Sequence, residues 1–206
     1  MSNSPLDIHA ASVVAQSKKD RVPGLGRGPG LKNKLESPNT LKILQFHING
    51  ISTCAAKIKP DQILKLAEGQ GVQIIALQET KLKINSTLKI KGYHIYRTVR
   101  RNKSGGGLSF LIRGINYQSI DINTRIINNT NLEIQGITVT WRGRSLNIFN
   151  MYHPPDLKSL PNEILYLFFE SSICIGDLNV KHPTWGSTNI NPRGIELLNV
   201  IDDKSS

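Results

Sequence analysis

The sequence predicts an α/β fold in which two packed β-sheets are flanked by helices. The chain has 206 residues, enough for one domain with a substantial core. From residue 41 onward, short apolar stretches of strand length alternate with turns rich in glycine, proline and asparagine. Only a few stretches have helical periodicity, and they lie between the strands. Many strands with interspersed helices are typical of a layered α/β sandwich.

In the first half of the globular region, the pattern predicts four strands and one helix. The first strand begins at Leu41 and Gly50 marks its end; the others are residues 72–78, 93–98 and 108–112, and all are rich in apolar or aromatic residues. The helix begins at Pro60 and carries the apolar residues Ile63, Leu64, Leu66 and Ala67, and Gly69 or Gly71 ends it.

In the second half, residues 132–141 alternate in polarity, and Arg142-Gly143 makes a tight turn into residues 145–151, which predicts a hairpin. A short helix is expected at 162–170 and a buried strand at 172–176. Asn191 should cap a last helix that has Pro192 in its first turn.

Residues 1–40 differ in composition from the rest. They are basic, and the stretch VPGLGRGPGLKNK has too many glycines and prolines for a helix and no strand alternation. We interpret 1–40 as a disordered arm or linker and 41–206 as the folded domain.

The formal net charge is +11 and the sequence pI is about 9.8, which favours an acidic partner, nucleic acid first. The cysteines, Cys54 and Cys174, form no metal or redox motif. No stretch resembles a membrane span or a secretion signal, so we expect an intracellular protein.

Several predicted strands end in polar residues. The first ends at His47 and Asn49, which alternation places on one side, and the next runs into Glu79. A buried strand is followed by Asp177 and Asn179. Each has a simpler interpretation, because a glutamate at a strand end can reach solvent and an Asp-Asn turn can satisfy its own backbone.

Two further motifs have the same ambiguity. Tyr152 ends a strand before Pro154-Pro155, which fixes the following loop and can hold the hydroxyl at a site. Taken by itself, Tyr152 is more simply interpreted as a tyrosine at the rim with its ring in the core.

His182, in the stretch HPTWGS, has loop packing as its simplest role. The glycine run at 105–107 lacks the lysine, the hydroxyl and the helix of a phosphate-binding loop, and we interpret it as a loop entering a strand.

The coincidence of these motifs is more informative than any one of them. Four separate strands end, in order, in polar residues of compatible chemistry. Strand ends that meet at one edge of a sandwich can build an active site on rigid elements.

Asn-Gly after the first strand, Gln-Glu-Thr, Tyr-x-Pro-Pro and Gly-Asp-Leu-Asn together resemble the endonuclease/exonuclease/phosphatase superfamily. The stretches LEIQGITVTWRGRSLNIFNMYHPPD and GDLNVKHPTWGSTNINPRG are similar to its apurinic-type endonuclease branch in jockey-like non-LTR retrotransposons. The similarity runs from about residue 41 to 203. It implies a DNase I-like pair of mixed sheets and hydrolysis of a phosphodiester with Mg²⁺ or Mn²⁺, here to nick target DNA and prime reverse transcription.

The resemblance also implies roles for individual residues. Glu79 is the expected metal carboxylate, with Asn49 helping to hold the metal or its water. Asp177 is expected to orient and activate the attacking water, Asn179 to align the site, and Tyr152 to donate to the scissile phosphate. His182 is a candidate substrate contact.

Two departures from the family pattern affect the expected activity. The family usually has asparagine where this chain has His47, and imidazole suits zinc or iron better than magnesium. Either His47 hydrogen-bonds a neighbouring carboxylate, or the site has decayed; decay or partial loss is the expectation. The family's Ser-Asp-His motif does not appear before Ser206, so we expect a C-terminally truncated domain that lacks its last strands and has weak or no activity.

Three functions remain open. The first is a metal-dependent DNA endonuclease that acts in the nucleus, with a reverse transcriptase following in a longer product. The second is a retroelement remnant that binds nucleic acid without specificity. The third keeps the superfamily but changes the substrate to a phosphoinositide or a repair lesion, and the segment 182–194 argues against it. The oligomeric state is not predicted.

Overall fold

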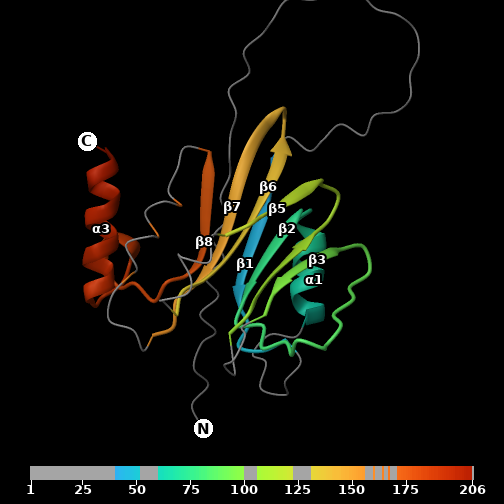
Figure 1. The fold of residues 1–206 in the computed structure, drawn as a ribbon, viewed down its shortest axis with the longest axis horizontal. Coiled ribbons are helices and arrows are strands. Elements are labelled where there is room, and N and C mark those ends of the chain that lie inside the picture. The colour runs from blue at the N-terminus through green and yellow to red at the C-terminus, as the bar shows by residue number, and fades with distance from the viewer. Residues whose placement is uncertain are drawn as a thin grey trace, which may run out of the picture.

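Two four-stranded sheets form the centre of the molecule, as the computed structural model shows (Figure 1). It describes residues 40–51, 60–99, 106–122, 131–155, 160, 164, 167 and 171–205. The first sheet has the order β1-β2-β4-β3, with β1 (Ile43–His47), β2 (Ile74–Gln78), β3 (His94–Thr98) and β4 (Leu108–Ile112). The second has the order β5-β6-β7-β8, with β5 (Tyr117–Ile120), β6 (Glu133–Trp141), β7 (Arg144–Tyr152) and β8 (Ser172–Asp177).

Both sheets are mixed, as predicted. In the first, β1 pairs with β2 in parallel, whereas β4 is antiparallel to β2 and β3. In the second, β6 and β7 form the predicted hairpin, and β7 pairs with β8 in parallel. The hairpin turn has positive φ at both Arg142 (52°) and Gly143 (79°), the combination found in type I′ turns.

One helix covers the outer face of each sheet. The buried side of α1 (Pro60–Gly69) lies against the first sheet through Ile63 and Ala67. On the second sheet, α3 (Pro192–Ser205) is packed through Leu197. In Figure 1 the two helices accordingly lie on opposite sides of the paired sheets. No helix in the described part of the chain is long and apolar enough to cross a bilayer.

The space between the sheets is filled in layers. At one end it is aliphatic and aromatic, with Ile43, Ile74, Phe110, Ile137 and Ile148 in one buried cluster. Because side chains on one face of a strand recur at every second residue, the next inward positions form a second layer. Three of these positions are the amides Gln45, Gln135 and Asn150, whereas β2 has Ala76 there and its amide, Gln78, comes two residues later. We call Gln45, Gln78, Gln135 and Asn150 the amide layer, and the last three are fully buried or nearly so.

Buried hydrogen bonds of this amide layer join the two sheets. Gln78 Nε2 donates to Asn150 Oδ1 at 2.6 Å, and Asn150 Nδ2 donates to the carbonyls of Leu77 (3.1 Å) and Ser109 (3.4 Å). Gln45 Nε2 donates to Gln78 Oε1 at 3.2 Å. The side chains of Gln78 and Asn150 therefore have partners in the interior, although the buried Gln135 Oε1 accepts no hydrogen bond from the described residues. The bonds of Gln78 and Asn150 fix how one sheet sits on the other.

Some predictions differ from the structure or lie outside its described part. Strand β5 was not predicted, because YQSI is short, half-exposed and only weakly apolar. The 3-10 turn η2 (Pro183–Trp185) was also missed. Residues 1–39 and most of the expected helix at 162–170 lie outside the described residues, so the arm and that helix stay predictions.

Replacing Asn150 by alanine should lower the free energy of unfolding by about 2 kcal/mol, because Gln78 loses a buried partner. Urea denaturation measures this. Asn147→Ala is the matched control on the same strand: its part-buried amide oxygen accepts one bond from Thr138 Oγ1, and its loss should cost at most about 1 kcal/mol. Equal losses in the two variants would argue against a special role for the amide layer.

Candidate active site

The predicted polar residues meet beyond the amide layer, at one edge of the sandwich. Strands β1 and β2 run parallel and end there together, and β7 and β8 do the same in the other sheet. Because β1 and β8 contact each other across the sandwich, the ends of all four strands converge. His47, Glu79, Tyr152 and Asp177 lie at these ends, as the sequence predicted.

His47 links the two carboxylates. Its Nδ1 lies 2.8 Å from Asp177 Oδ2, and its Nε2 lies 3.2 Å from Glu79 Oε2. An ionised carboxylate only accepts hydrogen bonds, so both ring nitrogens must carry a proton when Asp177 and Glu79 are ionised. The bond to Asp177 in particular raises the pKa of His47, against the opposing effect of burial, and the bond to Glu79 adds to the rise. Of the two alternatives for this histidine, the geometry corresponds to the one that hydrogen-bonds a carboxylate.

Glu79 is held from three directions. Tyr152 donates its hydroxyl to Glu79 Oε1 at 2.7 Å, while His47 and the Lys81 ammonium, at 3.8 Å, approach Oε2. Burial works to raise the pKa of Glu79, but the bonds from Tyr152 and His47 and the charge of Lys81 lower it below its ordinary value. Glu79 is thus an ionised carboxylate at neutral pH.

Tyr152 is a hydrogen-bond donor whose ring is almost fully buried. Burial, followed by the bond to Glu79 and nearby carboxylate charge, raises the pKa of Tyr152 well above its usual range. Its ring meets the His47 ring edge-on, with centroids 5.3 Å apart and an interplanar angle of 86°. The hydroxyl therefore keeps its proton and points into the site.

Backbone strain concentrates at this edge. Among the described residues, six other than glycine have positive φ, and four of them adjoin the strand ends: Asn49 (50°), Glu79 (52°), Lys81 (51°) and Asn179 (53°). Left-handed backbone is costly for such residues and persists where the surroundings enforce it, often at functional sites. Here, Gly50 N–H donates to the Glu79 carbonyl at 2.7 Å, which joins the loops after β1 and β2.

The loop after β8 positions Asp177. Gly176 has φ of 150°, and a Cβ there would collide with the backbone of Met151 on the neighbouring strand, so glycine allows the close approach. Asn179 N–H donates to Asp177 Oδ1 at 2.9 Å, whereas the Asn179 amide Nδ2 donates to the His153 carbonyl at 2.9 Å. The Asn179 side chain therefore braces the loop in this structure.

Asn191 and Arg193 hold the same loop from the other side. Asn191 Oδ1 accepts from Lys181 N–H and from Gly194 N–H, both at 2.9 Å, and its Nδ2 donates to the Asn179 carbonyl at 2.8 Å. The bond from Gly194, at the third helical position, makes Asn191 the predicted cap of α3. Arg193, which is almost fully buried, donates to the Leu178 carbonyl at 3.3 Å. Sequence reasoning missed Arg193, because nothing local distinguishes it from a surface arginine.

Another missed residue is Glu133, at the start of β6. Its Oε2 accepts from Gly107 N–H at 2.6 Å, and its charge contributes to the raised pKa of Tyr152. The glycine loop also pairs with the Glu79 loop, since Thr80 N–H donates to the Gly107 carbonyl (3.0 Å) and Lys81 N–H to that of Gly106 (2.8 Å). The loop enters β4, as predicted, and it also supports the site.

His182 contacts its own turn, at Thr184 and Trp185. Its Nδ1 lies 2.9 Å from Thr184 Oγ1, and its ring is 5.8 Å from that of Trp185, so it caps the short turn η2. These contacts fit the packing interpretation, and its contact with substrate stays a prediction.

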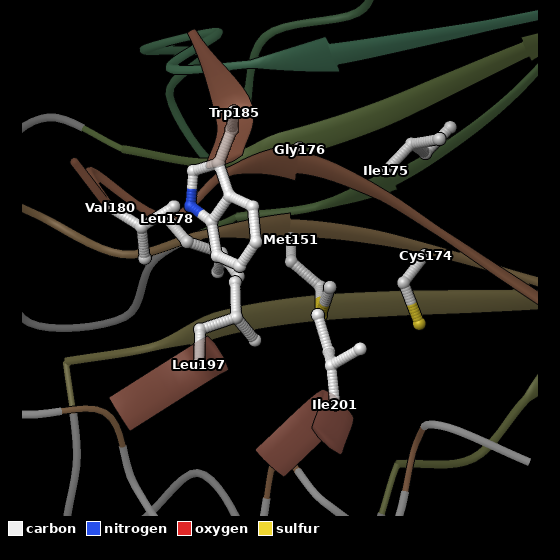
Figure 2. Close-up of a pocket in the computed structure, with 9 residues that line it drawn as sticks. All are labelled: Met151, Cys174, Ile175, Gly176, Leu178, Val180, Trp185, Leu197 and Ile201. Atoms are coloured by element: carbon white, nitrogen blue, oxygen red, sulfur yellow. The ribbon is translucent and has the colours of Figure 1, made fainter. Parts of the chain in front are cut away.

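An apolar cavity of about 300 Å³ lies on the opposite face of the second sheet (Figure 2). Met151 and Gly176 line it and precede Tyr152 and Asp177 by one residue, so strand alternation separates the cavity from the polar site. Trp185, Leu197 and Ile201 close it from the turn and from α3. The cavity therefore belongs to the packing between the sheet and the helix.

The chain is similar to retrotransposon proteins in sequence and in fold. Residues 146–206 match the family model described as endonuclease-reverse transcriptase. The chain is 28% identical over 169 residues to the probable RNA-directed DNA polymerase from transposon BS of Drosophila melanogaster, across 79% of this chain and 18% of that protein. Its structure matches the endonuclease domain of TRAS1, a telomere-specific non-LTR retrotransposon, with a TM-score of 0.57 and 15% identity, over 79% of this chain and 70% of that one.

The resemblance to the endonuclease/exonuclease/phosphatase superfamily is confirmed. So is the DNase I-like pair of mixed sheets, because the TRAS1 endonuclease domain shares this fold. The family match contains the end of β7 with Tyr152 and all of β8 with Asp177, and it supports a nuclease-like function. The chain spans only 18% of the length of the Drosophila relative. The narrower assignment to jockey-like elements stays a prediction.

Nucleases of this superfamily generally use divalent metals. Two side-chain oxygens of this site, Asn49 Oδ1 and Glu79 Oε2, already lie around one cation. Asn49 Oδ1 accepts a hydrogen bond from the Lys81 ammonium, which also lies 3.8 Å from Glu79 Oε2. The two expected metal ligands thus converge on one positive charge. Within the described residues, no group of three or more His, Cys, Asp and Glu side chains is arranged to hold a metal ion. His47 meets the two carboxylates through different nitrogens, so one ion could not contact all three.

The imidazole of His47 should titrate above its ordinary pKa of about 6.5, and Asp177→Asn should bring the midpoint down. NMR of the histidine ring protons measures both. Because the folded-state pKa is raised, the pair stabilises the fold fully below about pH 6.5, and this contribution fades as pH rises through the raised pKa. Asp202→Asn, on α3, is the control and should leave the His47 midpoint unchanged. An unchanged midpoint in Asp177→Asn as well would contradict the hydrogen bond between His47 and Asp177.

Asn191→Ala should destabilise the protein by about 1–2 kcal/mol, because it removes the cap of α3 and two bonds to the Asp177 loop. Thermal unfolding followed by circular dichroism tests this. The exposed neighbour Asn189 is the matched control, and its alanine variant should stay within about 0.5 kcal/mol of the parent. If both variants unfold at the parent's temperature, Asn191 does not brace the loop.

Proposed function

We propose that the chain is a divalent-metal-dependent DNA endonuclease that nicks one strand of target DNA to prime reverse transcription of a retrotransposon. The observation that carries this proposal is the single hydrogen-bonded network of Glu79, His47, Tyr152 and Asp177 at one edge of a nuclease fold. The similarity to a transposon RNA-directed DNA polymerase favours a retroelement and a reverse transcriptase in a longer product. The substrate would then be chromosomal DNA, in the nucleus.

In this proposal, Glu79 and Asn49 hold Mg²⁺ or Mn²⁺, since carboxylate and amide oxygens suit these ions. When bound, the ion neutralises charge that develops on the phosphate oxygens. Tyr152, which keeps its proton, donates its hydroxyl hydrogen to a phosphate oxygen once the substrate competes with Glu79. These three residues therefore act on the phosphate.

Asp177 acts on the attacking water. The Asn179 N–H holds Asp177 Oδ1, and His47 Nδ1 holds Oδ2, so the carboxylate is fixed in orientation. A fixed carboxylate can accept a proton from water with little reorganisation. His47 and Asn179 are positioning residues in this scheme, and the net charge of +11 would hold the DNA backbone.

Nicking of supercoiled plasmid tests the proposal. Activity that requires Mg²⁺ or Mn²⁺ should fall by about 100-fold or more in Glu79→Ala and in Asp177→Asn, because each removes a group that acts on the reacting atoms. Glu68→Ala is the control, since Glu68 lies exposed on α1 beside Arg113, and its rate should stay within about twofold. Equal nicking by all variants would show that the cleavage comes from elsewhere.

A second function is favoured by one observation: the basic side chains of His47 and Lys81 already contact the site carboxylates. A site neutralised in this way could be weak or inactive, leaving a basic chain that binds nucleic acid without specificity. Binding would then weaken with salt and ignore both Mg²⁺ and the Glu79→Ala change. The plasmid assay separates the two, because only the endonuclease gives nicked product.

A further inference from the structure

Lys81 occupies the point on which the two proposed metal ligands converge. Its ammonium donates to Asn49 Oδ1 and lies 3.8 Å from Glu79 Oε2. These are the oxygens assigned above to a divalent ion. A lysine ammonium is a compact positive charge, so it satisfies the same oxygens that a metal ion would need.

The backbone fixes this arrangement. Lys81 N–H donates to the Gly106 carbonyl at 2.8 Å, and Thr80 between Lys81 and Glu79 is nearly fully buried. On the other side, the loop of Asn49 is joined to Glu79 through Gly50 N–H. The backbone at Asn49, Glu79 and Lys81 is left-handed in each case. These backbone hydrogen bonds fix the turn that directs the ammonium at the two oxygens. The Lys81 side chain is about 35% exposed, so the ammonium can move away into solvent.

The same oxygen of Glu79 has two nitrogen contacts. Glu79 Oε2 lies 3.8 Å from the Lys81 ammonium and 3.2 Å from His47 Nε2. An arriving divalent ion must therefore displace the Lys81 ammonium to reach the oxygens of Asn49 and Glu79.

We propose that Lys81 is a built-in competitor for the divalent ion: its ammonium and the ion bind the same oxygens of Asn49 and Glu79 in turn. This rests on the proposed function, because it assumes that the ion binds there. It makes Lys81 a residue that sets the affinity of the site for metal, so that the ion binds only after the ammonium has moved away. Removing the ammonium should tighten metal binding even without DNA.

The experiment is a titration with Mn²⁺ alone, at neutral pH and low salt, in which electron paramagnetic resonance measures the free ion. Lys81→Met should bind Mn²⁺ about tenfold more tightly than the parent chain, because one adjacent positive charge and one occupant are gone. Lys81→Arg keeps the charge and should stay near the parent. Lys83→Met is the matched control two residues on, and its affinity should change by at most about twofold. Glu79→Ala should abolish this binding.

The outcomes separate the inference from the function beneath it. Unchanged or weaker affinity in Lys81→Met, with binding still lost in Glu79→Ala, overturns the competition and leaves the proposed metal site standing. Equal affinity in Glu79→Ala and the parent overturns both, since the ion would then bind elsewhere. Circular dichroism checks that each variant is folded, and Lys81→Gln replaces the methionine variant if that one is not.

Discussion

The hydrogen bonds of Asn150 hold the two sheets in the one alignment that creates the site. Asn150 and its partner Gln78 are fully buried, and three bonds of Asn150 cross from β7 to the first sheet: one from Gln78 and two to the carbonyls of Leu77 and Ser109. Sliding one sheet over the other would leave these amides without partners, at a cost of several kcal/mol in an apolar interior. Hydrophobic side chains alone are less demanding, because apolar contacts have no direction. The amide layer therefore sets the geometry that the next layer needs.

The next layer is built in two ways. Tyr152 lies two residues beyond Asn150, so strand periodicity places it on the same face. Glu79 comes directly after Gln78, at the end of β2, and its left-handed backbone (φ 52°) departs from strand alternation. Tyr152 then reaches across the interface to Glu79, as Asn150 reaches Gln78 one layer deeper. The interior thus becomes more polar in steps, from aliphatic to amide to ionisable, toward the edge where solvent enters. Carboxylates at this edge retain partial hydration and fixed partners, which avoids the full penalty of a buried charge.

The sequence predicted much of this edge because its signals are local. A buried strand that runs into Glu79, or into Asp177 and Asn179, can be recognised without knowing what it pairs with. The partners of these residues could not be predicted in the same way. Glu133, Arg193 and the cross-sheet amides act through contacts that are distant in sequence, and β5 is held by pairing with β6 rather than by its own hydrophobic pattern. Asn179 was expected to align the site; its side chain donates to the His153 carbonyl and braces the loop after β8, and its role toward the substrate stays a prediction.

His47 shows how the choice of one side chain sets the electrostatics of this site. An asparagine amide at this position could bond both carboxylates only through its NH₂ group and would bring no charge. Imidazole donates through two nitrogens that face opposite ways, so it spans Asp177 and Glu79 and, when protonated, adds a full positive charge between them. Both carboxylates are therefore paired through His47, and Glu79 Oε2 also has the Lys81 ammonium at 3.8 Å. The electrostatics of this edge thus depend on its basic residues as much as on its acidic ones.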